Sequence, residues 1–128
     1  GIVNTGQWSS DMDNAANKLF VTEFTKAYGR VPSTYASQAW DAAYLLDAAV
    51  LNIGGKIEDR DAFIAAIKEA KGFKSVRGDF KFDRNHFPIQ NQYARVVTKM
   101  PDGSFLNKMV GPVLKDHSDA YIGQCTMK

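Results

Sequence analysis

Residues 28–43, YGRVPSTYASQAWDAA, join two expected helices and decide the layout of the chain. Gly29 suits the left-handed residue that follows a helix end, and Pro32 cannot continue that helix. Ser33, or the threonine after it, can cap a second helix, whose first amides then point outward and can hold an anion. Tyr35 stands at this helix mouth. The stretch therefore predicts a capped helix that opens with an aromatic side chain.

Three helices are expected, over about residues 12–28, 34–52 and 59–70. Apolar side chains recur in the first helix at three- and four-residue steps, which predicts one buried face. These side chains are Ala16, Leu19, Phe20, Phe24, Ala27 and Tyr28. The second helix is apolar around most of its circumference, which predicts burial on several sides. Glycines at 54, 55 and 72 end the second and third helices.

After residue 76 the apolar period changes from helical spacing to alternation. Residues 2–5 form a short β-like segment, and residues 79–83 alternate phenylalanine with charged side chains, as in a half-buried strand. Two further strands are expected over 93–100 and 105–110, joined by a hairpin turn at 101–104. The expected fold class is α/β, with three helices followed by an antiparallel β-meander. The second helix is too apolar for these partners, so either the chain oligomerises or part of its core lies elsewhere.

Charge and cysteine content limit the possible partners. Sixteen basic and fourteen acidic residues are interspersed along the chain and leave a net charge of +2. This balance argues against a nucleic-acid partner or a polybasic membrane surface. The single cysteine, Cys125, is either an unpaired thiol or half of a disulfide whose partner lies outside this sequence.

Two groups of side chains raise the possibility of a metal site or an enzyme. Asp83 and His86 lie in a turn-like stretch, but two ligands are too few for zinc and no other His or Cys stands at ligand spacing. Asp116, His117 and Ser118 are adjacent, and neighbouring residues do not point at one another as a triad requires. We therefore expect no metal, no cofactor and no enzymatic activity, and keep a small self-contained enzyme as an alternative.

Three segments in order resemble a known family. They are FxxxFxxxYGxxP at residues 20–32, YAxxxWDA at 35–42 and GxFxFD at 78–83. The set resembles the C-terminal part of periplasmic solute-binding proteins of ABC importers, in the branched-chain amino acid (type I periplasmic binding protein) family. The Tyr-Asp-Ala of that family is varied here to Trp-Asp-Ala at residues 40–42.

The resemblance implies a two-lobed α/β protein that closes by a hinge around a ligand in its cleft, of which this chain would be a C-terminal fragment. Residues 1–76 would supply a crossover strand and helices of lobe one. Residues 77–128 would supply strands that return to lobe two and a C-terminal tail. The remaining N-terminal part of the same protein, or a second copy of the chain, would complete the core.

The function that the resemblance implies is that of an extracytoplasmic, periplasmic receptor. Its ligand would be a small carboxylate, such as a branched-chain amino acid or an aromatic acid, which it delivers to the membrane permease of an ABC importer. The alternatives from other classes are the self-contained enzyme above and an oligomerising interaction module. The identity of the ligand stays open, because the main contacts to its carboxylate lie outside this chain in the family.

Four residues are candidates for ligand binding. The helix-mouth position of Tyr35 and the family resemblance both indicate that it contacts the side chain of the ligand. Its other possible role is packing between helices. Gln38, one turn further, faces either the same cleft or solvent. Gln7 and Trp8 follow the crossover segment, and Trp8 is either a stacking wall for a ligand ring or a core tryptophan.

Overall fold

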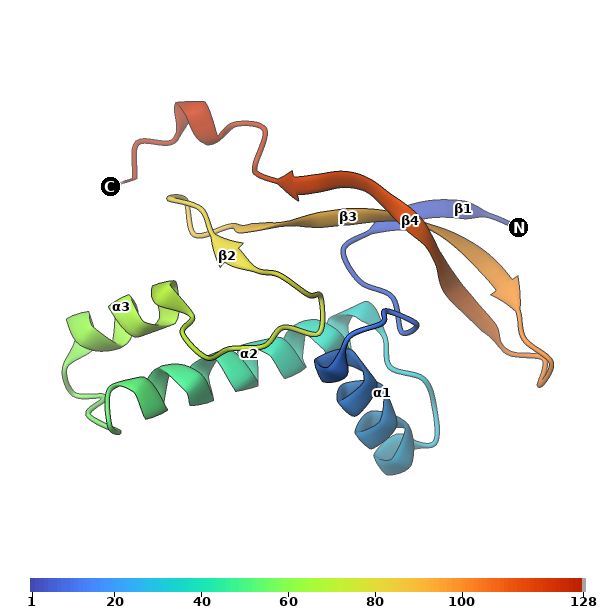
Figure 1. Cartoon of the computed structure of the whole chain (residues 1–128), viewed down its shortest axis with the longest axis horizontal. Coiled ribbons are helices and arrows are strands. Elements are labelled where there is room, and N and C mark those ends of the chain that lie inside the picture. The colour runs from blue at the N-terminus through green and yellow to red at the C-terminus, as the bar shows by residue number, and fades with distance from the viewer. Residues whose placement is uncertain (128) are drawn as a thin grey trace.

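The computed structural model describes residues 1–127, which form a tier of three helices and a tier built on a four-stranded sheet (Figure 1). In chain order the elements are β1 (Val3–Gly6), α1 (Ala15–Tyr28), α2 (Thr34–Asn52), α3 (Arg60–Glu69), β2 (Lys81–Phe82), β3 (Pro88–Lys99), β4 (Phe105–His117) and the 3-10 turn η1 (Ile122–Gln124). Across the described residues, each helix is too short or too polar to cross a membrane. The expected fold class, helices followed by antiparallel strands, is confirmed.

The junction between α1 and α2 follows the expected caps. Gly29 ends α1 in the left-handed conformation, with φ 65°, and its N–H donates to the Thr25 carbonyl at 2.8 Å. Ser33 caps α2, because its Oγ accepts a hydrogen bond from the Ala36 N–H at 3.3 Å. These bonds satisfy backbone groups that a helix end otherwise leaves unpaired. The sharp reversal places the first turn of α2 beside the sheet tier.

The start of α1 differs from the expected position. The helix begins at Ala15 rather than near Met12, because Asn14 is extended and acts as its N-cap. The Asn14 Oδ1 accepts from the Asn17 N–H at 2.8 Å. Residues 9–12 instead form a tight bend, in which the Met12 N–H donates to the Ser9 carbonyl at 3.1 Å.

β3 is the central strand of the sheet, flanked by β1 and β4, and both neighbours run antiparallel to it. All four residues of β1 pair with β3, in a register that sets Val3 opposite Val96, and β4 pairs along nearly the whole of β3. The expected hairpin turn at 101–104 is present, with the Met100 N–H bonded to the Ser104 carbonyl at 2.8 Å. β2 pairs only at the start of β3.

The strand lengths differ from those expected. β3 begins at Pro88 and β4 extends to His117, whereas β2 covers two residues instead of five. Residues 88–92 and 111–117 lack clean alternation, yet they form strands because they pair with each other, as in Gln90↔His117. Cross-strand pairing stabilises a strand whatever the local pattern, so this extension is a tertiary effect.

The core lies where the two tiers meet. Trp8, Met12, Phe20 and Val76 form its buried cluster. The Phe20 ring is central, with its centroid 5.9 Å from the Trp8 ring and 5.1 Å from the Trp40 ring. Side chains from β3 and β4 pack partly against this cluster, so the same cluster holds the helices to the sheet.

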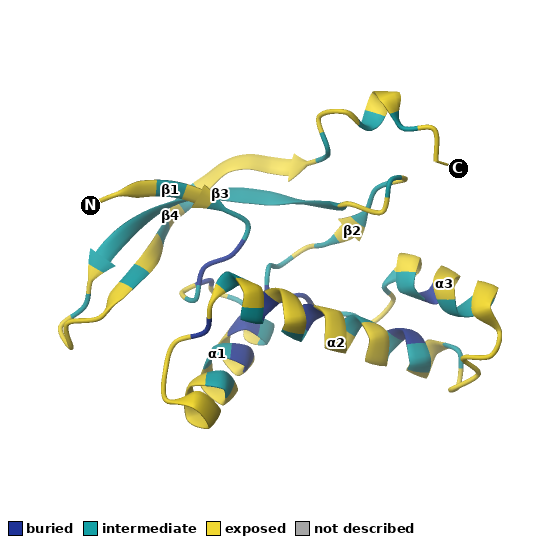
Figure 2. Cartoon of the chain, turned by 180° about the vertical axis from the view of Figure 1, so that it is seen from behind, coloured by how far each residue is buried: buried dark blue, intermediate teal, exposed yellow. Residues whose placement is uncertain are grey.

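Within this chain the second helix is not buried on several sides, which agrees with the expectation that it is too apolar for the partners supplied here. Of its residues only Ser37, Asp41 and Ala49 are buried, while Leu46 and Leu51 are exposed, and much of α2 is yellow in Figure 2. The reason is geometric, because the neighbouring elements cover one side of a helix that is apolar nearly all round.

Candidate functional site

A pocket of about 350 Å³ opens at the mouth of α2, between the helical tier and the β3–β4 hairpin. Its helical wall consists of residues 31–35, and its sheet wall consists of Arg95 with residues 105–107. Residues 8–10 also line it. The pocket therefore joins three segments that are far apart in sequence, which is typical of sites for small molecules.

Tyr35 is the most exposed large side chain of the helical wall. It lies in the first turn of α2 and 83% of its surface is accessible. The N-terminal amides of α2 carry the positive end of the helix dipole, and the Ser33 cap leaves some of them open to a ligand. The positive helix end can attract the carboxylate of an aromatic acid, and the tyrosine ring beside it can contact the aromatic part of the same ligand.

Arg95, on β3, brings a fixed positive charge to the opposite wall. Its Nε donates to the Asn4 Oδ1 at 2.9 Å, its Nη1 to the Trp8 carbonyl at 2.7 Å and its Nη2 to the Thr5 carbonyl at 2.8 Å. These bonds use three of the five guanidinium N–H groups. Gly6 permits this placement, because a Cβ there would lie 2.5 Å from the Arg95 Cζ.

Trp8 is a core tryptophan that also lines the pocket. Only 4% of its surface is accessible, and its indole Nε1 donates to the Asn17 Oδ1 at 2.7 Å. The Asn17 side chain is itself fully buried and donates to the Met12 carbonyl at 3.0 Å. Trp8 is therefore held rigidly at the edge of the pocket and has little free ring face for stacking.

The other two candidate residues lie elsewhere. Gln7 is half-buried and Gln38 is exposed, and the lining of the pocket includes neither of them. The structure thus brings together Tyr35 and Trp8 among the four predicted residues, and it adds Arg95. A charged residue at the centre of the otherwise apolar strand stretch YARVV, residues 93–97, is the sequence signal that could have found it.

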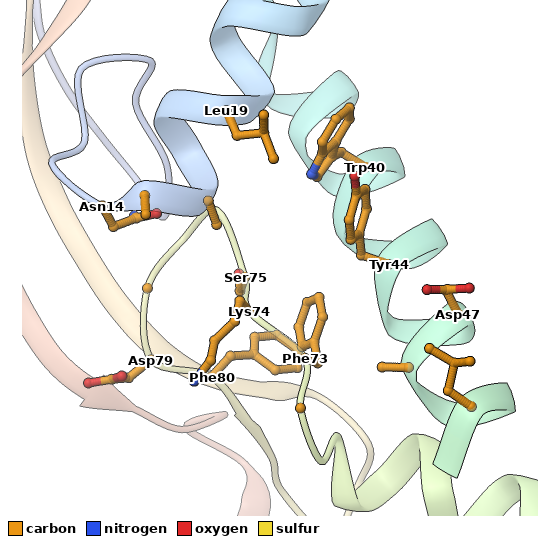
Figure 3. Close-up of a pocket in the computed structure, with 16 residues that line it drawn as sticks. Asn14, Leu19, Trp40, Tyr44, Asp47, Phe73, Lys74, Ser75, Asp79 and Phe80 are labelled. Atoms are coloured by element: carbon orange, nitrogen blue, oxygen red, sulfur yellow. The ribbon is translucent and has the colours of Figure 1, made fainter. Parts of the chain in front are cut away.

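A larger groove of about 900 Å³ lies between α1, α2 and the loop over residues 72–80 (Figure 3). Trp40 and Tyr44 line it from α2, Leu19 from α1, and Phe73 and Phe80 from the loop and its continuation. It contains none of the four predicted ligand residues. Its lining is mainly apolar and aromatic, with Asp47, Lys74 and Asp79 among the polar side chains at its edge.

The turn and tail side chains do not assemble catalytic geometry. The Ser118 Oγ donates to the Asp83 carboxylate rather than to His117. This bond, together with the N–H of Arg84, holds the pKa of Asp83 below its usual range. Within residues 1–127 no three His, Cys, Asp or Glu side chains are grouped as a metal site would need. Cys125 is a free thiol here.

The fold and the pocket between the tiers define an α/β protein with a small-molecule-sized cavity at a helix mouth. A profile of the family described as "Periplasmic binding protein" matches residues 1–103. The chain belongs to this family, as the ordered segments in its sequence predict.

Curated relatives and solved structures agree with this assignment. The Leu/Ile/Val-binding protein homolog 6 of Brucella abortus is 31% identical over 115 residues, which cover 86% of this chain and 28% of the relative. A solute-binding protein of R. palustris in complex with benzoate is 38% identical, with a TM-score of 0.76 over 98% of this chain and 33% of that one. Another, from Rhodopseudomonas palustris BisB5 with 3,4-dihydroxy benzoic acid, is 31% identical, with a TM-score of 0.80 and the same coverage.

Coverage of these relatives is partial. The chain spans about a third of the two solved structures and less than a third of the curated relative.

Proposed function

We propose that this chain forms one part of the ligand site of an extracytoplasmic solute-binding protein of an ABC importer. Its ligand would be a small carboxylate, an aromatic acid in preference to a branched-chain amino acid. The observation that carries this proposal is the pocket in which Tyr35 and the start of α2 face Arg95 across the two tiers.

The electrostatics of the pocket favour a carboxylate. The amide end of α2 and the Arg95 guanidinium lie on opposite walls of the same pocket, and both attract negative charge. Three of the guanidinium bonds go to protein oxygens, which fix its position before a ligand arrives. Tyr35 supplies an accessible ring for the apolar part of the ligand.

The ligands of the relatives support the aromatic class. One R. palustris structure is a complex with benzoate and another is a complex with 3,4-dihydroxy benzoic acid, and these relatives are 38% and 31% identical to this chain. The curated relative carries the name of a Leu/Ile/Val-binding protein homologue. A pocket of about 350 Å³ is large enough for either kind of ligand.

The partners follow from the same proposal. The full-length receptor would consist of two lobes that close on the ligand by a hinge. The apolar groove beside α2 would be covered by the remaining length of the same protein, since the relatives are about three times as long as this chain. The loaded receptor would act in the periplasm, dock on a membrane permease and release its ligand there.

The test is ligand binding by the full-length receptor that carries this chain. Isothermal titration with benzoate and with leucine should show binding of benzoate, and Tyr35→Ala should weaken it about tenfold. Tyr121→Ala is the matched control, because Tyr121 is 70% exposed on the tail and is absent from the pocket lining. Equal affinities of the two variants for benzoate would place the ligand elsewhere.

The charge requirement has its own test. Benzamide has nearly the shape of benzoate without its charge, so the proposed carboxylate contacts predict binding at least tenfold weaker for benzamide. Similar affinities for the two compounds would contradict a pocket built around Arg95 and the α2 amides.

A further inference from the structure

The bend at Ser75, Val76 and Arg77 is attached to the middle of α2 through a single carboxylate. The Asp41 Oδ2 accepts from the Ser75 Oγ at 2.6 Å and from the Arg77 Nε at 2.9 Å, and the Asp41 Oδ1 accepts from the Val76 N–H at 2.9 Å. The side chains of Asp41 and Arg77 are 3% and 10% exposed. The ion pair is therefore largely buried, and both carboxylate oxygens of Asp41 accept hydrogen bonds.

The same bend also contacts the other two elements that meet at the core. The Arg77 Nη1 donates to the Gln90 Oε1 on β3 at 2.8 Å. The Asn14 Nδ2, at the cap of α1, donates to the Val76 carbonyl at 3.0 Å. The Val76 side chain is fully buried in the core cluster. Thus α1, α2 and β3 are joined at one three-residue bend.

A buried ion pair adds little net stability, since desolvation offsets most of its attraction. The pair instead fixes geometry. The guanidinium is planar, so it can bond Asp41 and Gln90 together only when both acceptors lie in the directions of its N–H groups. Arg77 also lies over the Phe80 ring, with its Cζ 4.7 Å from the centroid, which limits its movement further. Its contacts therefore suit orientation better than stabilisation.

The bend joins α2 and β3, the two elements that carry Tyr35 and Arg95 on opposite walls of the proposed ligand pocket. Along α2, Tyr35 is six residues from Asp41, or roughly 9 Å at 1.5 Å per residue. Along β3, Arg95 is five residues from Gln90, or roughly 17 Å. A rotation of about 5° at the bend would move the far end of the β3 arm by about 1.5 Å, enough to break a hydrogen bond.

We infer that Arg77 is a positioning residue for ligand binding. Through Asp41 and Gln90 it holds the α2 wall at a fixed distance from the β3–β4 wall, although it does not line the pocket itself. The inference rests on the proposed function, since it assigns Arg77 to the same site. The inference predicts a fixed distance between the helical tier and the sheet tier, and this distance can be measured without any ligand.

The test removes the hydrogen bond between Arg77 and Gln90 and leaves the ion pair between Arg77 and Asp41 intact. Gln90→Leu removes the acceptor of Arg77, while Gln90→Glu keeps an oxygen in the same place. The matched control is Lys18→Gln, which breaks an exposed ion pair with Asp13 on the helical tier. All variants are made in the full-length receptor, with benzoate as the probe.

Two readouts separate positioning from stability. The dissociation constant for benzoate is measured well below the melting temperature, where every variant is fully folded and a loss of stability alone leaves it unchanged. The distance between spin labels at exposed Gln38→Cys and Lys108→Cys, in a Cys125→Ser background, reports the separation of the tiers without ligand.

The expected result is about tenfold weaker binding of benzoate and a shifted or broader distance for Gln90→Leu. Both values should equal those of the unmodified receptor for Gln90→Glu and Lys18→Gln. Unchanged binding or an unchanged distance for Gln90→Leu would overturn the inference, as would equal defects in Gln90→Leu and Gln90→Glu. If the unmodified receptor binds no benzoate, the proposed ligand fails, and the distances alone decide whether Arg77 positions the tiers.

Discussion

Substituting Asn17 by aspartate should destabilise the protein in a strongly pH-dependent way. The side chain is fully buried, and its Nδ2 donates to the carbonyl oxygens of Met12 and Ser10 at 3.0 and 3.2 Å. A carboxylate oxygen in that position would face these oxygens without a proton to share. The Oδ1 that accepts from the Trp8 indole would remain. The substitution therefore keeps the shape and removes only the donor.

The magnitude follows from the groups left unpaired. The Met12 carbonyl keeps the Asn14 N–H at 3.1 Å, so the Ser10 carbonyl is the one that loses its donor. A buried carbonyl without a partner costs about 1–3 kcal/mol, and an uncompensated buried charge adds to this, so a loss of roughly 3–5 kcal/mol is expected at pH 7.5. Burial raises the folded-state pKa of the new carboxyl above its unfolded value of about 3.9. Stability is therefore retained below about pH 4 and is lost as pH rises through the raised folded-state pKa.

Urea denaturation at pH 7.5 and at pH 4.5 measures both effects. The matched control is Asn52→Asp, since the Asn52 Nδ2 donates to the Lys71 carbonyl at 2.8 Å from an exposed position. This control should lose under about 1 kcal/mol, with little dependence on pH. Similar losses for the two variants, or a loss from Asn17→Asp that is equal at both pH values, would refute the reasoning.

Three further predictions concern the pocket and the tail. Tyr35→Ala should change the free energy of unfolding by less than about 0.5 kcal/mol, because the side chain is exposed, and a larger loss in urea denaturation would indicate a packing role. Gly6→Ala should cost about 2–3 kcal/mol by displacing the Arg95 guanidinium, and the double variant with Arg95→Ala should lose less than the sum of both singles. Because the Ser118 hydroxyl lowers the pKa of the Asp83 carboxyl, their contact persists above about pH 4 and is lost as pH falls through that lowered pKa. Protection factors of the amides in residues 118–124, which are corrected for the intrinsic pH dependence of exchange, should then fall in acid, and Asp83→Asn should abolish this fall.

The end of α1 and the start of α2 could be predicted because their signals are local. Gly29 tolerates the left-handed backbone, and Ser33 carries its cap acceptor three residues from the amide it bonds. The turn at 101–104 follows from the same kind of preference, with Gly103 at φ 85°. The family resemblance rests on these segments too, and the match over residues 1–103 agrees with it.

The strand ends and the start of α1 escaped prediction for the opposite reason. Residues 111–117 have little strand pattern of their own, and they are extended because β3 lies beside them. α1 starts late because Asn14 bonds both its own helix and the Val76 carbonyl, 62 residues away. Signals of this kind depend on which segments become neighbours, and no window of sequence contains them.

The site divides in the same way. The position of Tyr35 at an exposed helix mouth follows from Gly29, Pro32 and Ser33, whose backbone preferences act within a few residues. The wall opposite Tyr35 depends on tertiary structure, since Arg95 reaches the pocket through β3, and its guanidinium is fixed by oxygens about 90 residues away. Hydrogen bonds at that separation form only after the chain has closed on itself, because each one depends on a partner that folding must first bring near.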